Sequence, residues 1–295
     1  MAAGAIRSIT MNVYREFSQA ELDHEYDVFQ CVPAANLQAY RARWADQNVE
    51  ARASTHCAFD IRYAEGERSL LDVYHFGRSD PRPVQIYIHG GFWHMNSREE
   101  ASYVSAGLRG AGYVTVVPGY DLVPRGSIPS QVRQLSQAVL WVRRNIRHYG
   151  GDPSDIHLIG HSAGAHLAAM LLTLDTTAID PAFASGIRSA NLISGMFDLE
   201  PIRKSSLNAK LGLRVEDIAA ISPSRLRPFV RDLTLRLAVG SEESGEFFRQ
   251  ACELAAAWRD AIPAIELTNV AGCDHFSIRA ELYHPRSTVT RFVTQ

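Results

Sequence analysis

The sequence predicts an α/β fold, a mainly parallel sheet of about eight strands covered by helices on both faces. Residues 84–88 and 114–117 are short β-branched runs, continuously apolar like strands that are buried on both faces. Between such runs, residues 131–149 carry apolar side chains at the spacing of an amphipathic helix. Repeated alternation of the two patterns favours parallel strands joined by helices.

An antiparallel hairpin is expected at the start of the sheet, because two alternating stretches flank the turn-forming Glu65-Gly66-Glu67. We predict the remaining strands at residues 57–63, 69–74, 156–159, 191–194, 233–239 and 265–270. Residues 1–55, with a helix over 34–47, are expected as an extension packed on the core, and residues 56–295 as a single domain. The irregular residues 197–228 are expected to form an insertion over one sheet edge and over the functional site.

Composition excludes several classes of protein. The 295 residues are 46% hydrophobic and 21% charged with a net charge of -2, which is ordinary for a globular domain. That charge lacks the basic excess that nucleic-acid binding requires. Only Lys204 and Lys210 could form a lysine Schiff base.

A cytoplasmic protein is expected. The first thirty residues lack the basic and apolar regions of a signal peptide, and no apolar run is long enough to span a membrane. The four cysteines are far apart and form no C-x-x-C pair, which argues against a disulfide scaffold or a zinc site.

The motif Gly160-His161-Ser162-Ala163-Gly164 matches the pattern G-x-S-x-G. It follows an apolar run and precedes a strong helix-forming segment, which is the strand–turn–helix context of a nucleophile elbow. In that turn the serine side chain stands clear of the backbone, above the N-terminus of the helix. The sequence therefore predicts Ser162 as a nucleophile.

A second motif, His89-Gly90-Gly91-Phe92-Trp93, directly follows the strand predicted at residues 84–88. Acyl transfer needs backbone N–H donors directed at the developing oxyanion, and glycines let the backbone approach that position. We predict an oxyanion hole formed by Gly90, Gly91 or Phe92 together with Ala163. Phe92 and Trp93 are expected as walls of the acyl pocket, and His161 as a further pocket residue.

A serine nucleophile needs a histidine base, which follows it in the chain order of this architecture. Three histidines follow Ser162. His166 lies one helical turn further on and is expected to point into packing, and His284 precedes Pro285 near the chain end. His275 lies in the loop after the last predicted strand and is the predicted base.

The acid that orients the base is expected in the loop after the strand at residues 233–239. Glu243 stands three residues after Gly240, which matches the reach of G-x-x-D loops. Glu242 and Asp198 remain as alternatives.

Roughly residues 60–295 resemble the α/β-hydrolase superfamily, and within it the arylformamidase (kynurenine formamidase) and esterase group. The resemblance rests on the glycine-rich motif at residues 89–93, the elbow through His166-Leu167, Glu243 with Glu246-Phe247, and Ala20-Glu21-Leu22-Asp23 with Tyr26. It implies an α/β-hydrolase fold, and it carries over Ser162, His275 and the oxyanion loop. Members of the group often have Asp where Glu243 stands. Because glutamate is one methylene longer, the histidine loop should lie slightly farther away.

The resemblance implies a serine hydrolase that cleaves an N-formyl aryl amide, such as an N-formylkynurenine-like compound, or a small carboxylic ester. A short-chain or aryl carboxylesterase is the alternative, since the same residues serve both reactions. A non-catalytic ligand-binding hydrolase fold would have a broken triad, whereas all three positions are filled here. No metal or organic cofactor is implied. The expected partner is a small-molecule substrate whose carboxylate the arginines of residues 197–228 could bind, and homodimer formation is left open.

Overall fold

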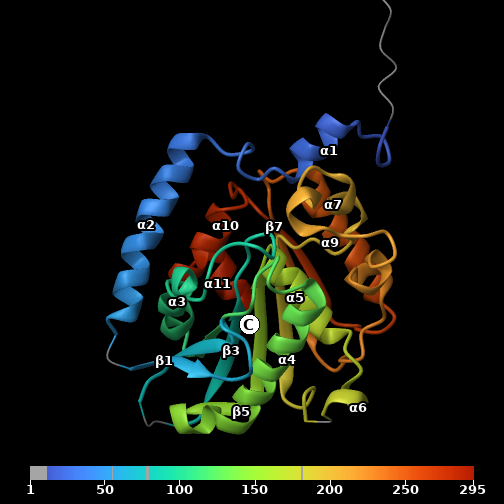
Figure 1. Ribbon diagram of the computed structural model, residues 1–295. Helices are drawn as coiled ribbons and strands as arrows, with labels where there is room; N and C mark the ends of the chain where they lie inside the picture. The colour runs from blue at the N-terminus through green and yellow to red at the C-terminus, as the bar shows by residue number, and fades with distance from the viewer. Residues whose placement is uncertain (1–11, 55, 78–79, 181) are drawn as a thin grey trace, which may run out of the picture.

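The computed structural model describes residues 12–54, 56–77, 80–180 and 182–295. In these residues a single eight-stranded sheet runs through the molecule in the order β1-β2-β4-β3-β5-β6-β7-β8, with helices on both faces (Figure 1). The predicted fold class, an α/β-hydrolase fold, is confirmed. The strands are β1 (Cys57–Arg62), β2 (Leu70–Tyr74), β3 (Arg82–Ile88), β4 (Val114–Pro118), β5 (Gly151–His161), β6 (Ile187–Ile193), β7 (Thr234–Gly240) and β8 (Ile265–Val270).

Strand direction follows the sequence patterns. β2 pairs antiparallel with β1 and with β4, and all the pairs from β4 to β8 are parallel. Strand β4 is buried at every position, as its continuous β-branched run predicts. Because β3, β5, β6, β7 and β8 are parallel, the loops that follow them meet at one edge of the sheet.

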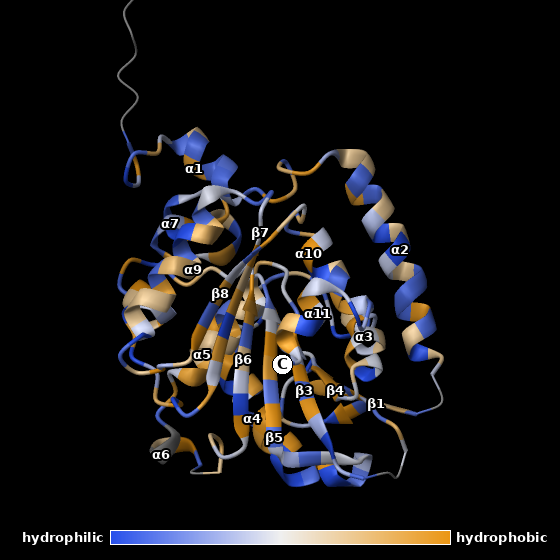
Figure 2. Ribbon diagram, turned by 180° about the vertical axis from the view of Figure 1, so that it is seen from behind, coloured by the Kyte–Doolittle hydropathy of each residue, from blue (hydrophilic) through white to orange (hydrophobic). Residues whose placement is uncertain are grey.

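Helices cover the sheet in two layers. Helices α4 and α5 lie on one face and α3 and α11 on the other, and the apolar strands lie between the layers (Figures 1 and 2). The longer helices are α1 (Gln19–Tyr26), α2 (Ala34–Arg52), α3 (Val104–Gly110), α4 (Ile128–Asn145), α5 (Ala163–Leu172), α9 (Gly245–Trp258) and α11 (Thr288–Val293). The shorter ones are α6 (Thr176–Ile179), α7 (Glu200–Lys204), α8 (Asn208–Leu211) and α10 (Ser277–Ala280). Five 3-10 turns among the described residues complete the set: η1 (Glu99–Ala101), η2 (Ile146–Tyr149), η3 (Ile218–Ala220), η4 (Pro223–Arg225) and η5 (Glu281–Tyr283).

The N-terminal segment contributes to the core although it precedes the sheet in the chain. Leu22, Tyr26 and Trp44 are buried in the same hydrophobic cluster as the strands. The Tyr26 hydroxyl donates to Oε2 of Glu246 in α9 at 2.6 Å and accepts from Nε2 of Gln250 at 2.6 Å. These buried hydrogen bonds fix α1 against α9. Helix α2 lies at one side of the molecule in both views.

No helix within the described ranges combines the length and the apolar character needed to cross a bilayer.

Candidate active site

Ser162 occupies a sharp turn between β5, which ends at His161, and α5, which begins at Ala163. Its backbone has φ 57° and ψ −124°, a conformation that costs a non-glycine residue about 1–3 kcal/mol. Hydrogen bonds hold the turn: the Ser162 N–H donates to the Ile193 carbonyl at 2.8 Å, and the Ser162 carbonyl accepts from the Ala165 N–H at 2.9 Å. The motif therefore forms the predicted strand–turn–helix elbow.

The two glycines of the motif are required by close packing. A Cβ atom at Gly160 would lie 2.2 Å from the carbonyl oxygen of Gly164, and one at Gly164 would lie 2.0 Å from that of Ile88. Both contacts are with backbone that cannot move aside. The spacing of the motif thus lets α5 pack directly against β5 and β3.

The glycine-rich loop after β3 runs beside the serine. A Cβ atom at Gly90 would lie 3.1 Å from the Cβ of Ser162. The N–H groups of Gly91, Phe92 and Ala163 donate to no other described residue. Backbone donors left free beside an elbow serine are what an oxyanion hole needs. The structure thus brings the predicted oxyanion residues to the serine.

His275 and Glu243 form a buried pair next to the elbow. The Nδ1 atom of His275 lies 2.6 Å from Oε2 of Glu243, whose side chain is 0% exposed. The other carboxylate oxygen, Oε1, accepts from the Ser194 hydroxyl at 2.6 Å and from the Gly240 N–H at 2.7 Å. Both oxygens of Glu243 are therefore satisfied, and the carboxylate has one orientation, toward the imidazole.

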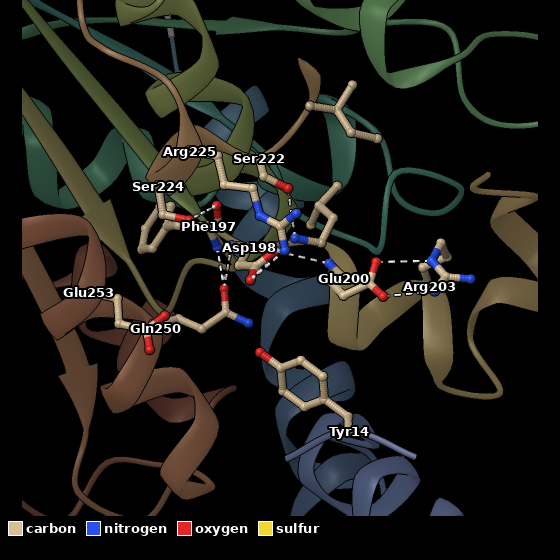
Figure 3. A network of polar contacts seen from close by, with 12 residues as sticks. Tyr14, Phe197, Asp198, Glu200, Arg203, Ser222, Ser224, Arg225, Gln250 and Glu253 are labelled. Atoms are coloured by element: carbon tan, nitrogen blue, oxygen red, sulfur yellow. Dashed lines mark hydrogen bonds and ion pairs between the residues drawn. The ribbon is translucent and has the colours of Figure 1, made fainter. Parts of the chain in front are cut away.

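The two other predicted acids lie elsewhere. Glu242 is exposed to solvent. Asp198 forms an ion pair with Arg225 at 2.9 Å, and its Oδ1 accepts from the Glu200 N–H at 3.1 Å (Figure 3). In the described structure neither carboxylate contacts His275, whereas that of Glu243 does.

The two other histidines that follow Ser162 have separate surroundings. His166 in α5 is fully buried, and burial lowers its pKa to about 4, so it is neutral. Its Nε2–H donates to the Ile221 carbonyl at 2.7 Å, and its Nδ1 accepts from the Trp93 indole at 3.1 Å. His284 is exposed, with its ring against Tyr283.

A cavity of about 400 Å³ opens above the serine. Ser162, His275, Gly91 and Phe92 form one part of its wall. Another part comes from the N-terminal segment and from the residues after the histidine: Val28, Phe29, Arg41, Trp44, Ala45, Asn48, Phe276 and Arg279. Helix α2 therefore supplies part of the cavity wall.

The predicted insertion does not cover this cavity. None of residues 197–228 is among the residues that line it. Apolar side chains of this segment, including Ile202, Ile218 and Ile221, are buried, and α7 packs against α1. Because the segment is anchored there, its arginines do not reach the serine; Arg203 pairs with Glu200 and Arg225 with Asp198.

Trp93 also differs from its prediction as a pocket wall. It is fully buried, does not line the cavity, and donates its indole N–H to His166 in the core. Phe92, one residue earlier, does line the cavity. Both residues have positive φ angles, 48° and 60°, and this tight backbone sends the two neighbouring rings to different places.

Two uncharged histidines form part of the cavity wall. Burial lowers the pKa of His161 well below its usual value, and the positive charge of Arg279 contributes to the lowering. Its Nε2–H donates to the carbonyl of His275 at 2.9 Å, which ties the elbow to the histidine loop. Burial lowers the pKa of His89 to about 4, and its Nδ1–H donates to the Gly90 carbonyl at 2.9 Å. His161 thus lines the cavity, and its hydrogen bond also holds the histidine loop.

Three site residues were not found by sequence analysis: Ser194, Trp44 and Arg279. Ser194 ends the run predicted as a strand and has φ 51°, a local feature that composition does not reveal. Trp44 belongs to the predicted N-terminal helix, but nothing in its own segment indicates that it lines the cavity of the serine. Arg279 stands four residues after the predicted base, and that proximity was the available signal. Among the described residues, no cluster of three or more His, Cys, Asp or Glu side chains could hold a metal ion.

An elbow serine after a central parallel strand, reached by loops from the neighbouring strands, is the arrangement of the α/β hydrolases. The profile of the BD-FAE family matches residues 71–194. A kynurenine formamidase from Danio rerio is 32% identical over 292 residues, covering 96% of this chain and 98% of that one. The chain therefore belongs to the arylformamidase/esterase group of α/β hydrolases, the family of that kynurenine formamidase, and it is a hydrolase.

One further relative and one solved structure are also similar to this chain. Esterase LipQ from Mycobacterium tuberculosis is 36% identical over 149 residues, which is 48% of this chain and 35% of that protein. The crystal structure of a proposed thioesterase from Silicibacter sp. TM1040 superposes with a TM-score of 0.81 at 28% identity, covering 93% of this chain and 99% of that one.

Proposed function

We propose that this protein hydrolyses N-formyl aryl amides through a covalent acyl-enzyme on Ser162. The observation that carries the proposal is the buried His275–Glu243 pair, 2.6 Å between Nδ1 and Oε2, whose imidazole lines the cavity that contains the elbow serine. The similarity to the Danio rerio kynurenine formamidase supports the substrate class, because a match over 96% of the chain extends through α2, which walls the cavity.

The chemistry follows from the roles that the geometry allows. Glu243 accepts the Nδ1–H of His275, which leaves Nε2 free to take the proton from Ser162 as its oxygen attacks the formyl carbonyl. The free N–H groups of Phe92 and Ala163 stabilise the tetrahedral oxyanion, at about 3–4 kcal/mol per donor. His275 then protonates the departing amine and activates the water that hydrolyses the formyl-enzyme. No resident cofactor takes part in the proposed steps.

A small-ester substrate is the second candidate, and the similarity to esterase LipQ favours it. Both reactions use the same nucleophile, base and oxyanion donors, so the site alone does not separate them. In either case the proposed substrate is a small molecule, and the proposed location is the cytoplasm.

Relative catalytic efficiency tests the proposed function. The purified protein should hydrolyse N-formylkynurenine with a kcat/KM at least tenfold above that for p-nitrophenyl acetate. The ester carries the better leaving group, so any preference for the amide must come from binding in the cavity. The measurement is initial rates on both compounds in one buffer. A kcat/KM that is tenfold higher for the ester, with no detectable formamide hydrolysis, would assign the protein to the esterases instead.

The acyl side of the cavity should accept only small groups. Phe92 follows the oxyanion glycines directly and is 4% exposed at the cavity wall, so little volume remains beside the scissile carbonyl. In a series of p-nitrophenyl esters we expect kcat/KM to be highest for formyl or acetyl and to fall at least a hundredfold beyond butyryl. Phe92→Ala should move the optimum toward longer chains. An octanoyl optimum in the unmodified protein would contradict this prediction.

A further inference from the structure

Arg279 is a partly buried arginine that has no anionic partner among the residues that the structure describes. Its guanidinium carbon lies 3.7 Å from the centroid of the Trp44 ring. It forms no ion pair with any described residue, and its Nε is buried without a hydrogen-bond partner. The two more deeply buried arginines, Arg98 and Arg236, are paired with Asp72 and Glu266.

An unpaired guanidinium in a partly desolvated site is unfavourable unless an anion comes to it. Its planar fork of N–H donors matches the two oxygens of a carboxylate, which gives charge-assisted and bidentate hydrogen bonds. Stacking on Trp44 fixes the plane of the guanidinium in advance. The group is therefore held ready for a planar anion.

The position of Arg279 connects it to the reaction. It lines the same cavity as Ser162 and His275, and its helix α10 begins two residues after His275. Its charge contributes to lowering the pKa of His161 and of His89, both of which burial lowers most. The guanidinium thus lies within electrostatic range of the residues around the serine.

The other charged side chains near the cavity do not neutralise the charge of Arg279. Arg41 and Glu100 line the exposed part of the cavity. Asp274, next to the base, accepts from the Tyr40 hydroxyl at 3.0 Å and from the N–H groups of Phe276 and Ser277. Asp274 does not line the cavity, and the charged residues that do are Arg41, Arg279 and Glu100, so the lining has more cationic than anionic side chains and favours an anionic ligand.

We propose that Arg279 is a specificity-determining residue that binds a carboxylate carried by the leaving group. The substrate class is then an acylated aryl amine, or aryl alcohol, whose ring bears an arm ending in a carboxylate. The reacting acyl group would lie at Ser162 and Phe92, and the aryl ring would lie between them and Arg279, near Phe276. For formamide substrates this inference rests on the proposed function; for ester substrates it does not.

Matched substrate pairs test the inference. Each pair has the same aryl and acyl groups and differs only in the end of the arm, a carboxylate or its neutral primary carboxamide. One pair consists of formanilides and the other of phenyl acetates. The measured quantity is the ratio of kcat/KM for the carboxylate to kcat/KM for the carboxamide. Arg279→Met should reduce this ratio about 10- to 100-fold, mainly through KM, since a hydrogen bond to a charged group is lost. Arg279→Lys should restore part of it.

Arg286→Gln is the matched control, because Arg286 is an exposed arginine of the same C-terminal segment outside the cavity lining. It removes one positive charge and should leave the ratio at its original value. An unchanged ratio in Arg279→Met, or an equal reduction in Arg286→Gln, would overturn the proposal. If formanilides are not hydrolysed but the phenyl acetate pair shows the expected change, the proposed function fails while the role of Arg279 stands.

A binding measurement on the unmodified protein covers the case in which Arg279→Met does not fold. 3-Phenylpropionate should inhibit competitively, with an inhibition constant at least tenfold lower than that of 3-phenylpropionamide. Equal inhibition constants for the two compounds would reject a carboxylate site in this cavity.

Discussion

Ser162→Ala should lower kcat by about six orders of magnitude on any substrate that the protein hydrolyses. The change removes only the hydroxyl oxygen, and the alanine keeps the φ of 57° that the turn imposes. The backbone bonds of the elbow, to Ile193 and from Ala165, do not involve the side chain. We therefore expect the melting temperature to stay within a few degrees of the original value, so that the lost activity reports chemistry and not unfolding.

Covalent labelling provides the control for this prediction. After treatment with diisopropyl fluorophosphate, intact-mass and peptide analysis should find one adduct, on Ser162, and none in Ser162→Ala. Ser97 is another serine in the wall of the same cavity, and Ser97→Ala should be labelled like the unmodified protein. Loss of activity that accompanies an adduct on Ser97 or another residue would mean that the nucleophile is misassigned.

The fold could be predicted because its signals are local. A β-branched or alternating run of residues predicts each strand, and β8 has the predicted bounds of residues 265–270. The elbow and the oxyanion loop were found for the same reason. Each is a contiguous motif that determines its own backbone geometry, and the two motifs meet where a Cβ atom at Gly90 would lie 3.1 Å from the Cβ of Ser162.

The cover of the cavity could not be predicted, because it depends on contacts between distant parts of the chain. Trp44 contacts Arg279 and Phe276, which lie more than two hundred residues later in the chain. Neither segment contains a sequence pattern that predicts contact with the other. Residues 197–228 look irregular enough to lie over a site, but the burial of Ile202 and Ile221 anchors them against the core instead. Hydrophobicity shows that these segments are buried without showing where.

Adjacent residues in a tight loop present a similar difficulty. Their order in the sequence does not show whether Phe92 or Trp93 lines the cavity. In the structure the backbone turns Phe92 toward the cavity and Trp93 toward His166. The buried indole N–H requires an acceptor, and neutral His166 provides one. The acid of the proposed triad was ambiguous for a comparable reason, because Glu242 and Glu243 are neighbours and only the path of the loop separates them.

Glu243→Gln should lower kcat about 10⁴-fold at neutral pH. The glutamine fits the same space, and its Oε1 can still accept from Ser194 and the Gly240 N–H. Its amide NH₂ would then face Nδ1 of His275 and act as a donor. The imidazole would have to accept at Nδ1 and carry its proton on Nε2, the wrong tautomer to receive the proton of Ser162. Substrate KM should change little, because Glu243 lies behind the imidazole and not in the cavity wall.

Three further variants separate this orienting role from a general effect of charge. Glu242→Gln removes a carboxylate from the adjacent exposed position, and Asp198→Asn breaks the ion pair with Arg225; both should keep kcat within a fewfold of the original.

Glu243→Asp keeps the charge but shortens the side chain by one methylene. It therefore cannot reach His275 while holding its bonds to Ser194 and Gly240, and an intermediate loss of about ten- to a hundredfold is expected. Measured by initial rates, a collapse of kcat in Asp198→Asn with near-normal activity in Glu243→Gln would move the acid to the loop after β6. The opposite pattern is a collapse of kcat in Glu243→Gln with near-normal activity in Asp198→Asn. It would mean that the Glu243 carboxylate acts through its buried 2.6 Å contact with Nδ1 of His275.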